Sequence, residues 1–301
     1  MEAKFKIIFA MSVFGTLSIF VKHIPLPSAE IALFRAIIAA TVIAAYKAGS
    51  GSRMSFSLLK KDLPLLFLSG AAMGFNWILL FQAYKYTSVA IATLSYYFAP
   101  MIVMAACPIL FKERLGLKQA VCFLMASIGL VMVIGLGAGE ASTDKLLGIG
   151  FGLGAALLYA SVILLNKGIK TVSGMDRTLI QFFAAIIVLT PYVCVSGAIP
   201  PQQAGSIGLL SLLVLGLLHT GLAYCLYFSS LKDLSGQQAA ILSYIDPLVA
   251  ILVSVSLLAE HIRLIQILGG MMILGFTLLS ELKTPPGGNP LRALARGKSS
   301  G

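Results

Sequence analysis

The chain has 301 residues, of which 58% are hydrophobic and 11% are charged, and its net charge at pH 7 is +11. A soluble domain carries about 25% charged residues, so this composition, with a mean hydropathy of +0.96, excludes that class. The basic residues lie in short connectors between apolar runs, and no aromatic-basic stripe is present, which argues against nucleic acid as a partner.

Apolar runs long enough to cross a bilayer follow one another along almost the whole chain. The pattern predicts an all-α membrane protein with ten transmembrane helices. The first run follows Lys4 and Lys6 without a small-residue cleavage pattern, so we expect it to remain as a helix. The spans are expected at residues 5–22, 30–47, 63–84, 88–111, 118–136, 146–166, 178–196, 206–230, 236–259 and 264–281.

The basic residues predict which face of the membrane each connector occupies. If the N-terminus is inside, the inner connectors and tails hold all but five of the 22 Lys and Arg residues. The exceptions are Lys22, Lys85, Lys145 and Arg263 in outer connectors, and Arg35 within the second span. Because cytoplasmic loops are enriched in Lys and Arg, we expect a multi-pass protein of the cell inner (cytoplasmic) membrane with both termini in the cytoplasm.

The chain repeats itself weakly in sequence. An offset of 147 residues aligns Gly74, Trp77, Phe81, Tyr97, Pro100 and Glu113 with Gly221, Tyr224, Phe228, Tyr244, Pro247 and Glu260. An offset of 145 aligns Phe14 and Lys22 with Tyr159 and Lys167. Each half holds five spans, an odd number, so the second half must enter the membrane in the opposite orientation. We expect two inverted five-helix repeats, residues 1–136 and 137–283, and a disordered cytoplasmic tail, residues 284–301, rich in Pro, Gly and Ser.

Several short segments resemble a known family. The run Ala83-Tyr84-Lys85-Tyr86-Thr87-Ser88, the segment from Tyr97 to Pro100 and the helix end Phe111-Lys112-Glu113-Arg114-Leu115 resemble the EamA domain of the drug/metabolite transporter superfamily. The second half matches less closely, at residues 243–247 and 259–261. The resemblance implies that spans 1, 3, 4, 6, 8 and 9 surround a central cavity, spans 5 and 10 lie behind it, and spans 2 and 7 flank it. It also implies export of amino acids, similar small metabolites or drugs.

Two ionisable residues are expected within the membrane, where such groups are costly. Asp246 lies near the midplane of span 9, before Pro247, whose missing N–H should open the helix locally. It is a candidate for binding an amine or a coupling proton, with simple packing as the alternative. Arg35 in span 2 is a candidate for binding an anion or forming an outer gate; the alternative is that its side chain extends to the outer headgroups.

Polar and aromatic residues complete the predicted substrate site, which is expected to be an aromatic cavity with scattered hydrogen-bond donors. Its candidate residues, besides Asp246, are Asn76, Trp77, Tyr97, Tyr159, His219, Tyr224 and Tyr244. A lone histidine in a span is more often a packing residue, so His219 is assigned only to the lining. For Glu113 and Glu260, at helix C-termini, we favour a structural role in which Arg114 or Arg263 offsets the unfavourable helix dipole.

The leading hypothesis is a secondary transporter, not an enzyme, that exports a small-molecule substrate across the lipid bilayer, with proton coupling as an option. No Gly-x-x-x-x-Gly-Lys-Ser/Thr pattern is present, which argues against ATP as the driving force. The alternatives are an intramembrane lipid-modifying enzyme, for which the ionisable residues are too few, and a passive channel or structural subunit. We expect no cofactor and no metal, and either a monomer or a weak dimer.

The topology is testable by cysteine labelling. A cysteine placed at Arg53, in the connector between spans 2 and 3, should react with a membrane-impermeant thiol reagent only from the cytoplasmic side. Reaction from the outside of intact cells, in a background free of the four native cysteines, would contradict the predicted orientation.

Overall fold

The computed structural model describes residues 3–50, 56–111, 116–134, 142–169, 172, 174–197, 199–230, 242–243 and 245–282. Over these residues all regular elements are helical, so the fold class predicted from the sequence is confirmed. Seven of the described helices are long and apolar enough to cross a membrane. Three shorter apolar helices, Leu117–Val133, Ile245–Ser256 and Leu264–Ser280, correspond to the remaining expected spans.

The helices lie close to the predicted spans. The first five spans are formed by α1 (Ala3–Gly15) with α2 (Leu17–Lys22), α3 (Ser28–Gly49), α4 (Phe56–Tyr86), α5 (Val89–Tyr96) with α6 (Ala99–Phe111), and α7 (Leu117–Ile134). The next five are formed by α8 (Thr143–Gly168), α9 (Gly174–Val195), α10 (Gly205–Val214) with the π-helix η2 (Leu215–Leu222) and α11 (Ala223–Ser230), α13 (Ile245–Ser256), and α14 (Leu264–Glu281). A 3-10 turn, η1 (Pro201–Ala204), precedes α10. The main difference is in span 3, whose helix begins at Phe56 rather than at residue 63.

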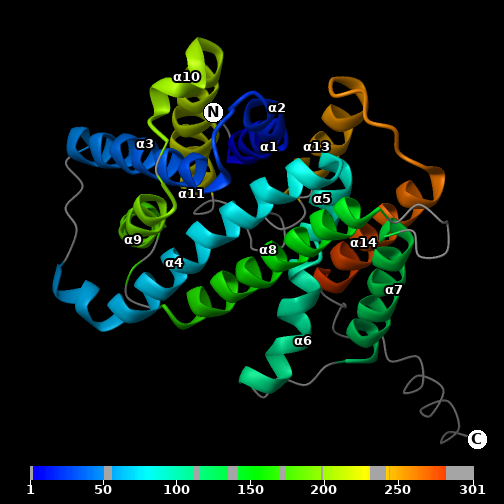
Figure 1. Cartoon of the computed structure of the whole chain (residues 1–301). Coiled ribbons are helices and arrows are strands. Elements are labelled where there is room, and N and C mark those ends of the chain that lie inside the picture. The colour runs from blue at the N-terminus through cyan, green and yellow to red at the C-terminus, as the bar shows by residue number, and fades with distance from the viewer. Residues whose placement is uncertain are drawn as a thin grey trace, which may run out of the picture.

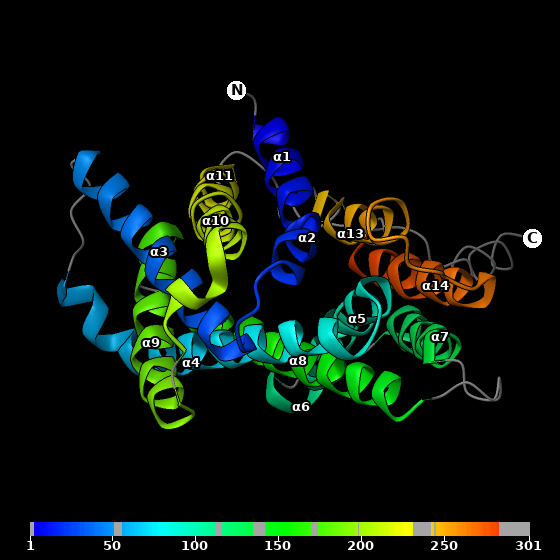
Figure 2. The same ribbon diagram turned by 45° about the horizontal axis from the view of Figure 1, so that its top comes forward.

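The packing of the helices follows the internal repeat. Helix α4 packs along α8, and its counterpart in the other half, η2 with α11, packs along α1. Helix α4 also packs on α9, and in the same way η2 packs on α3. Three further contacts join helices that occupy the same place in the two halves: α3 with α9, α5 with α13, and α7 with α14. Figures 1 and 2 show α7 beside α14 at one edge of the bundle, and Figure 2 shows α3 beside α9 at the other. Each major contact between spans therefore has a counterpart when the halves are exchanged.

Two glycines give the repeat a residue-level basis. A Cβ on Gly74 of α4 would lie 3.2 Å from the side chain of Leu189 on α9. A Cβ on Gly221 of η2 would lie 2.8 Å from the side chain of Val42 on α3. The offset of 147 residues relates Gly74 to Gly221 and Val42 to Leu189, so the two contacts are equivalent in the repeat. Small residues let helices approach closely in a membrane, and here the same approach is made twice.

Three spans depart from regular α-helix at the middle of the bundle. Span 1 breaks at Thr16, whose hydroxyl donates a hydrogen bond of 2.8 Å to the carbonyl of Val13. Span 4 breaks at Tyr97 and Phe98, because Pro100 has no N–H to donate to the preceding turn and suits the start of a new helix. Span 8 widens into the π-helix η2. Irregular backbone at membrane depth is tolerated where it is enclosed by protein or lines a cavity.

The bundle has two ends. We call the end formed by residues 23–27, 87–88, 196–197, 199–204 and 257–263 the distal face, and the end nearer the N-terminus the proximal face. Contacts between span ends support this grouping: Lys85 donates to the carbonyl of Leu26 and Lys22 pairs with Glu260 at the distal face, whereas Lys47 pairs with Asp176 at the proximal face.

A glycine at the contact between α7 and α14 provides a stability test. A Cβ on Gly269 would lie 2.5 Å from the carbonyl oxygen of Gly129, whereas one on Gly275 of the same helix meets nothing within 4 Å. Gly269→Leu should therefore lower the free energy of unfolding by about 1–3 kcal/mol through overpacking, and Gly275→Leu should be neutral or stabilising. Thermal stability in detergent measures both, and equal losses in the two variants would contradict the close contact.

Candidate functional site

A cavity of about 310 Å³ lies at the centre of the bundle. Spans 1, 3, 4, 6, 8 and 9 all contribute to its lining, as the family resemblance implies. Among the described residues, α7, α9 and α14 contribute none, and from span 2 only Arg35 reaches the lining. The cavity thus forms where the two halves meet.

Eight of the 21 described residues that line the cavity are aromatic. Tyr96 packs against Tyr159 with a centroid distance of 5.3 Å, and Tyr97 packs edge-on to Tyr96 at 5.7 Å. Phe14 and Tyr224 form a further edge-to-face pair at 5.2 Å. Because these rings come from spans 1, 4, 6 and 8, both halves contribute aromatic surface and tyrosine hydroxyl groups to the wall.

Arg35 is held inside the protein. Its side chain is 3% exposed, its guanidinium carbon lies 4.6 Å from the centre of the Trp77 ring, and its Nε donates a hydrogen bond of 2.6 Å to the hydroxyl of Thr220. This position excludes the alternative interpretation, in which the side chain of Arg35 extends to the outer headgroups. Among the described residues, Thr220 is the only hydrogen-bond partner of this guanidinium, and it binds Nε. The two Nη groups are therefore available to a ligand in the cavity.

The π-helix in span 8 positions the partner of Arg35. The hydroxyl of Thr220 donates to the carbonyl of Leu215, five residues earlier, at 2.9 Å, which leaves its oxygen free to accept from Arg35. His219 lies next to Thr220 and bonds through Nε2 to the hydroxyl of Thr16 at the break in span 1, at 3.0 Å. The wide turn thus connects span 8 with spans 1 and 2 at the same level.

Asp246 lines the same cavity as Arg35 but comes from the second half of the chain. Its carboxylate accepts a hydrogen bond of 2.5 Å from the hydroxyl of Tyr97, which lies at the break in span 4. A Cβ on Gly15 of α1 would lie 2.7 Å from the carbonyl oxygen of Asp246, so span 1 also approaches span 9 closely here. Asp246 and Arg35 are the only charged side chains among the described residues that line the cavity.

The structure brings together six of the nine residues selected from the sequence. Arg35, Trp77, Tyr97, Tyr159, Tyr224 and Asp246 all line the cavity. Asn76 and His219 do not: Asn76 donates to the carbonyl of Ala155 at 2.6 Å, and His219 packs edge-on against Phe20. Both are buried and bind neighbouring helices, and neither contributes to the lining of this cavity. Tyr244 lies outside the described residues.

Sequence reasoning missed several aromatic residues of the lining. Phe14, Tyr84, Tyr96 and Tyr227 belong to it as well. Tyr84 follows Trp77 by two helical turns, and Tyr227 follows Tyr224 by about one turn, so each shares a face with a residue that was selected. Helical spacing from the selected aromatic residues was therefore a signal that could have identified Tyr84 and Tyr227.

Glu260 has a different partner from the one expected. Its carboxylate forms an ion pair of 2.5 Å with Lys22 at the end of span 1, and not the expected contact with Arg263. Glu113 lies outside the described residues. In the part of the chain that the structure describes, no three His, Cys, Asp or Glu side chains are grouped closely enough to hold a metal ion.

An all-helical bundle of two similar halves, with broken helices around a central cavity, has the architecture of a membrane transporter. The chain belongs to the EamA-like transporter family, whose model matches it twice, over residues 3–135 and 146–281. These two matches agree with the repeat seen in the sequence and in the helix packing.

Relatives and a solved structure are similar over nearly the whole chain. The uncharacterized transporter YxxF of Bacillus subtilis (strain 168) is 30% identical over 273 residues, covering 90% of this chain and 86% of the relative. An uncharacterized transporter of Archaeoglobus fulgidus is 27% identical over 278 residues, covering 91% of this chain and 94% of the relative. A crystal structure with 17% sequence identity has the same fold, with a TM-score of 0.65 over 92% of this chain and 96% of that chain.

The bond between Arg35 and Thr220 is testable by a substitution that keeps the shape of the side chain. Thr220→Val leaves Nε of a buried guanidinium without an acceptor, which should lower the free energy of unfolding by about 1–3 kcal/mol. Thr190→Val is the control, because Thr190 is exposed and bonds only to the carbonyl of Ile186 in its own helix. Thermal unfolding that is equally unaffected in both variants would show that Thr220 does not hold Arg35.

Proposed function

We propose that this chain is a secondary-active transporter that exports amino acids or related small metabolites by alternating access around the central cavity. The observation that carries the proposal is that one guanidinium, from Arg35, and one carboxylate, from Asp246, both line a single aromatic cavity. The volume of about 310 Å³ is at the lower end of the range for ligand pockets, which suits a small metabolite.

The two charges suit a zwitterionic ligand. A guanidinium binds a carboxylate through two parallel N–H bonds, and the Nη groups of Arg35 are oriented by the bond from Nε to Thr220. The carboxylate of Asp246 accepts hydrogen bonds from an ammonium group, and the hydroxyl of Tyr97 orients it. Aromatic rings around both charges accommodate an apolar side chain and attract a cation to their faces.

Asp246 also provides a route for proton coupling. A proton and an ammonium group compete for the same carboxylate, so binding of an amine expels the proton and binding of a proton releases the amine. Intramembrane carboxylates commonly serve as proton relays. Exchange of this kind couples outward movement of the metabolite to inward movement of protons.

The basic residues orient the protein in the proposal. Since Lys and Arg are enriched on the cytoplasmic side, the proximal face is cytoplasmic and the distal face is the outer one. The cavity then receives its substrate from the cytoplasm and releases it at the distal face, and the protein belongs to the cytoplasmic membrane.

The test uses purified protein in liposomes, with amino acids, nucleosides and cationic drugs as substrates and with or without a pH gradient. Asp246→Asn keeps the size of the side chain but removes its charge and its titration. We expect a loss of about tenfold or more in transport of amine-bearing substrates, and loss of the response to the pH gradient, because a hydrogen bond to a charged group contributes about 1.5–3 kcal/mol.

The matched control is Asp144→Asn, which removes an exposed carboxylate in the first turn of α8. It should transport like the parent protein. If Asp246→Asn also matches the parent for every substrate charge and every pH gradient, the proposed role of this carboxylate is wrong.

A further inference from the structure

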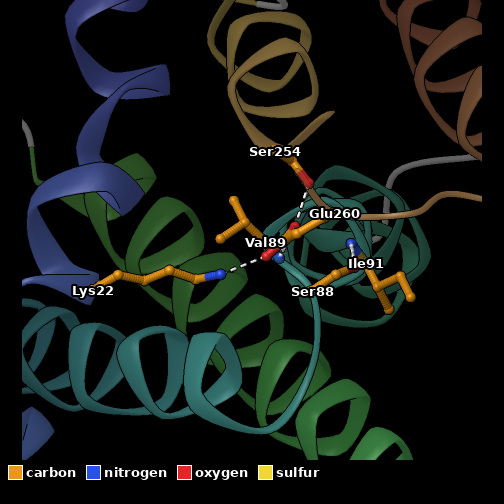
Figure 3. Close-up of polar contacts among 6 residues, drawn as sticks. All are labelled: Lys22, Ser88, Val89, Ile91, Ser254 and Glu260. Atoms are coloured by element: carbon orange, nitrogen blue, oxygen red, sulfur yellow. Dashed lines mark hydrogen bonds and ion pairs between the residues drawn. The ribbon is translucent and has the colours of Figure 1, made fainter. Parts of the chain in front are cut away.

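Glu260, outside the cavity, connects three spans at the distal face. Oε1 pairs with Nζ of Lys22 at 2.5 Å, and Oε2 accepts a hydrogen bond of 2.8 Å from the backbone N–H of Val89. Oε2 also accepts a hydrogen bond from the hydroxyl of Ser254. Figure 3 shows the carboxylate at the centre of these contacts, with Lys22 approaching from α2, Val89 at the start of α5 and Ser254 on α13. We call Lys22, Val89, Ser254 and Glu260 the distal latch.

Each partner of Glu260 lies about one helical turn beyond a residue of the cavity wall. Ser18, Thr93 and Ala250 line the cavity on spans 1, 4 and 9. Lys22 follows Ser18, Val89 precedes Thr93 and Ser254 follows Ala250, each by about one turn and each toward the distal face. The latch therefore joins three of the six lining spans directly above the cavity.

The local backbone is shaped to hold Glu260 in place. Ala259 has a φ of 50°, in the left-handed region that is unfavourable for a residue with a side chain. The N–H of Glu260 then donates 3.0 Å to the carbonyl of Ser254, so that the chain folds back over the end of α13. Strain of this kind persists only where surrounding contacts maintain it, and here these are the contacts of the Glu260 carboxylate.

The contact with Val89 is electrostatically favourable. The first N–H groups of a helix have no partner within it, and its N-terminus attracts negative charge. In α5, Ser88 accepts from the N–H of Ile91 and Glu260 accepts from that of Val89. The side chain of Glu260 is 12% exposed and that of Lys22 is 33% exposed, so solvent screens the pair only in part.

We propose that Glu260 is the gate residue of the distal face, and that the cavity opens to this face only when Glu260 releases Lys22 and Val89. The proposal rests on the proposed function only in requiring that the cavity opens to one face at a time. Opening separates spans 1 and 4 from span 9 on the distal side of the cavity, which breaks the contacts of the Glu260 carboxylate with Lys22 and Val89. The structure, with these contacts formed, is the state closed at the distal face.

The test measures access to the cavity and needs no knowledge of the substrate. Ser18→Cys places a thiol on the cavity wall, at a position where the described residues give the native hydroxyl no hydrogen-bond partner. Its reaction with a membrane-impermeant thiol reagent, added to each face in turn, is followed after Cys107, Cys122, Cys194 and Cys225 have been replaced by alanine. Lys22→Gln and Glu260→Gln should each raise the rate of labelling from the distal face about fivefold or more.

Two matched controls separate the latch from a general effect of charge. Lys145→Gln and Asp144→Asn remove one charge each near the distal end of α8, a lining span, and should leave labelling unchanged. The double variant Lys22→Gln with Glu260→Gln should be no faster than the faster single variant, because both substitutions open the same latch. Lys22→Gln keeps the contacts of Glu260 with Val89 and Ser254, so it tests the gate even if Glu260→Gln folds poorly.

Labelling rates from the distal face that stay at the parent value in both Lys22→Gln and Glu260→Gln would overturn the proposal, whatever the liposome assay gives for the substrate. Strictly multiplicative effects in the double variant would also overturn it. Failure of the substrate proposal appears elsewhere, as transport by Asp246→Asn that equals transport by the parent.

Discussion

The interior of a membrane offers polar groups no water, and the positions of the polar side chains in this protein follow from that constraint. Asn76 and Gln181 are buried and hydrogen-bonded to neighbouring helices, and His219 is held between spans 1 and 8. Arg35 is buried as well, but its bond to Thr220 satisfies only Nε, and it lies against the ring of Trp77. In the proposed function, the Nη groups of this guanidinium bind the carboxylate of the substrate in the cavity.

The inverted repeat explains why a cavity exists at all. Two similar halves that pack through equivalent spans leave a space on the axis between them, and the breaks at Thr16, at Tyr97 and in η2 lie around this space. At each break a backbone or hydroxyl group becomes available for contacts that a regular helix would not provide. Thr220 binds Arg35 from the π-helix, and Tyr97 binds Asp246 from the break in span 4. The halves are similar in packing and different in charge, since Ala99 occupies in the first half the place of Asp246 in the second.

Hydropathy was sufficient for the spans, because it depends on properties of one helix at a time. Comparison of the chain with itself gave the repeat, and the resemblance of short segments gave the family. The errors concern pairs of helices. Whether Asn76 faces the cavity or the carbonyl of Ala155 depends on how α4 is rotated against α8, and no periodicity within one span gives that angle. Glu260 was assigned to Arg263, its neighbour in sequence, while its partner Lys22 lies in the other half. The π-helix leaves no composition signal, because its residues are ordinary for a transmembrane span.

The proposed function depends most on opposite charges at Arg35 and Asp246 that bind one ligand together. The direct measurement is the thermal stability of the purified protein with matched sets of three molecules: an amino acid, the amine that lacks its carboxylate and the acid that lacks its amino group. A ligand that binds the folded state raises the unfolding temperature in proportion to its affinity and concentration. We expect that, in at least one set, the amino acid stabilises the protein more than the amine or the acid does at equal concentration. Stabilisation by the amine or the acid that equals that of the amino acid in every set would contradict it.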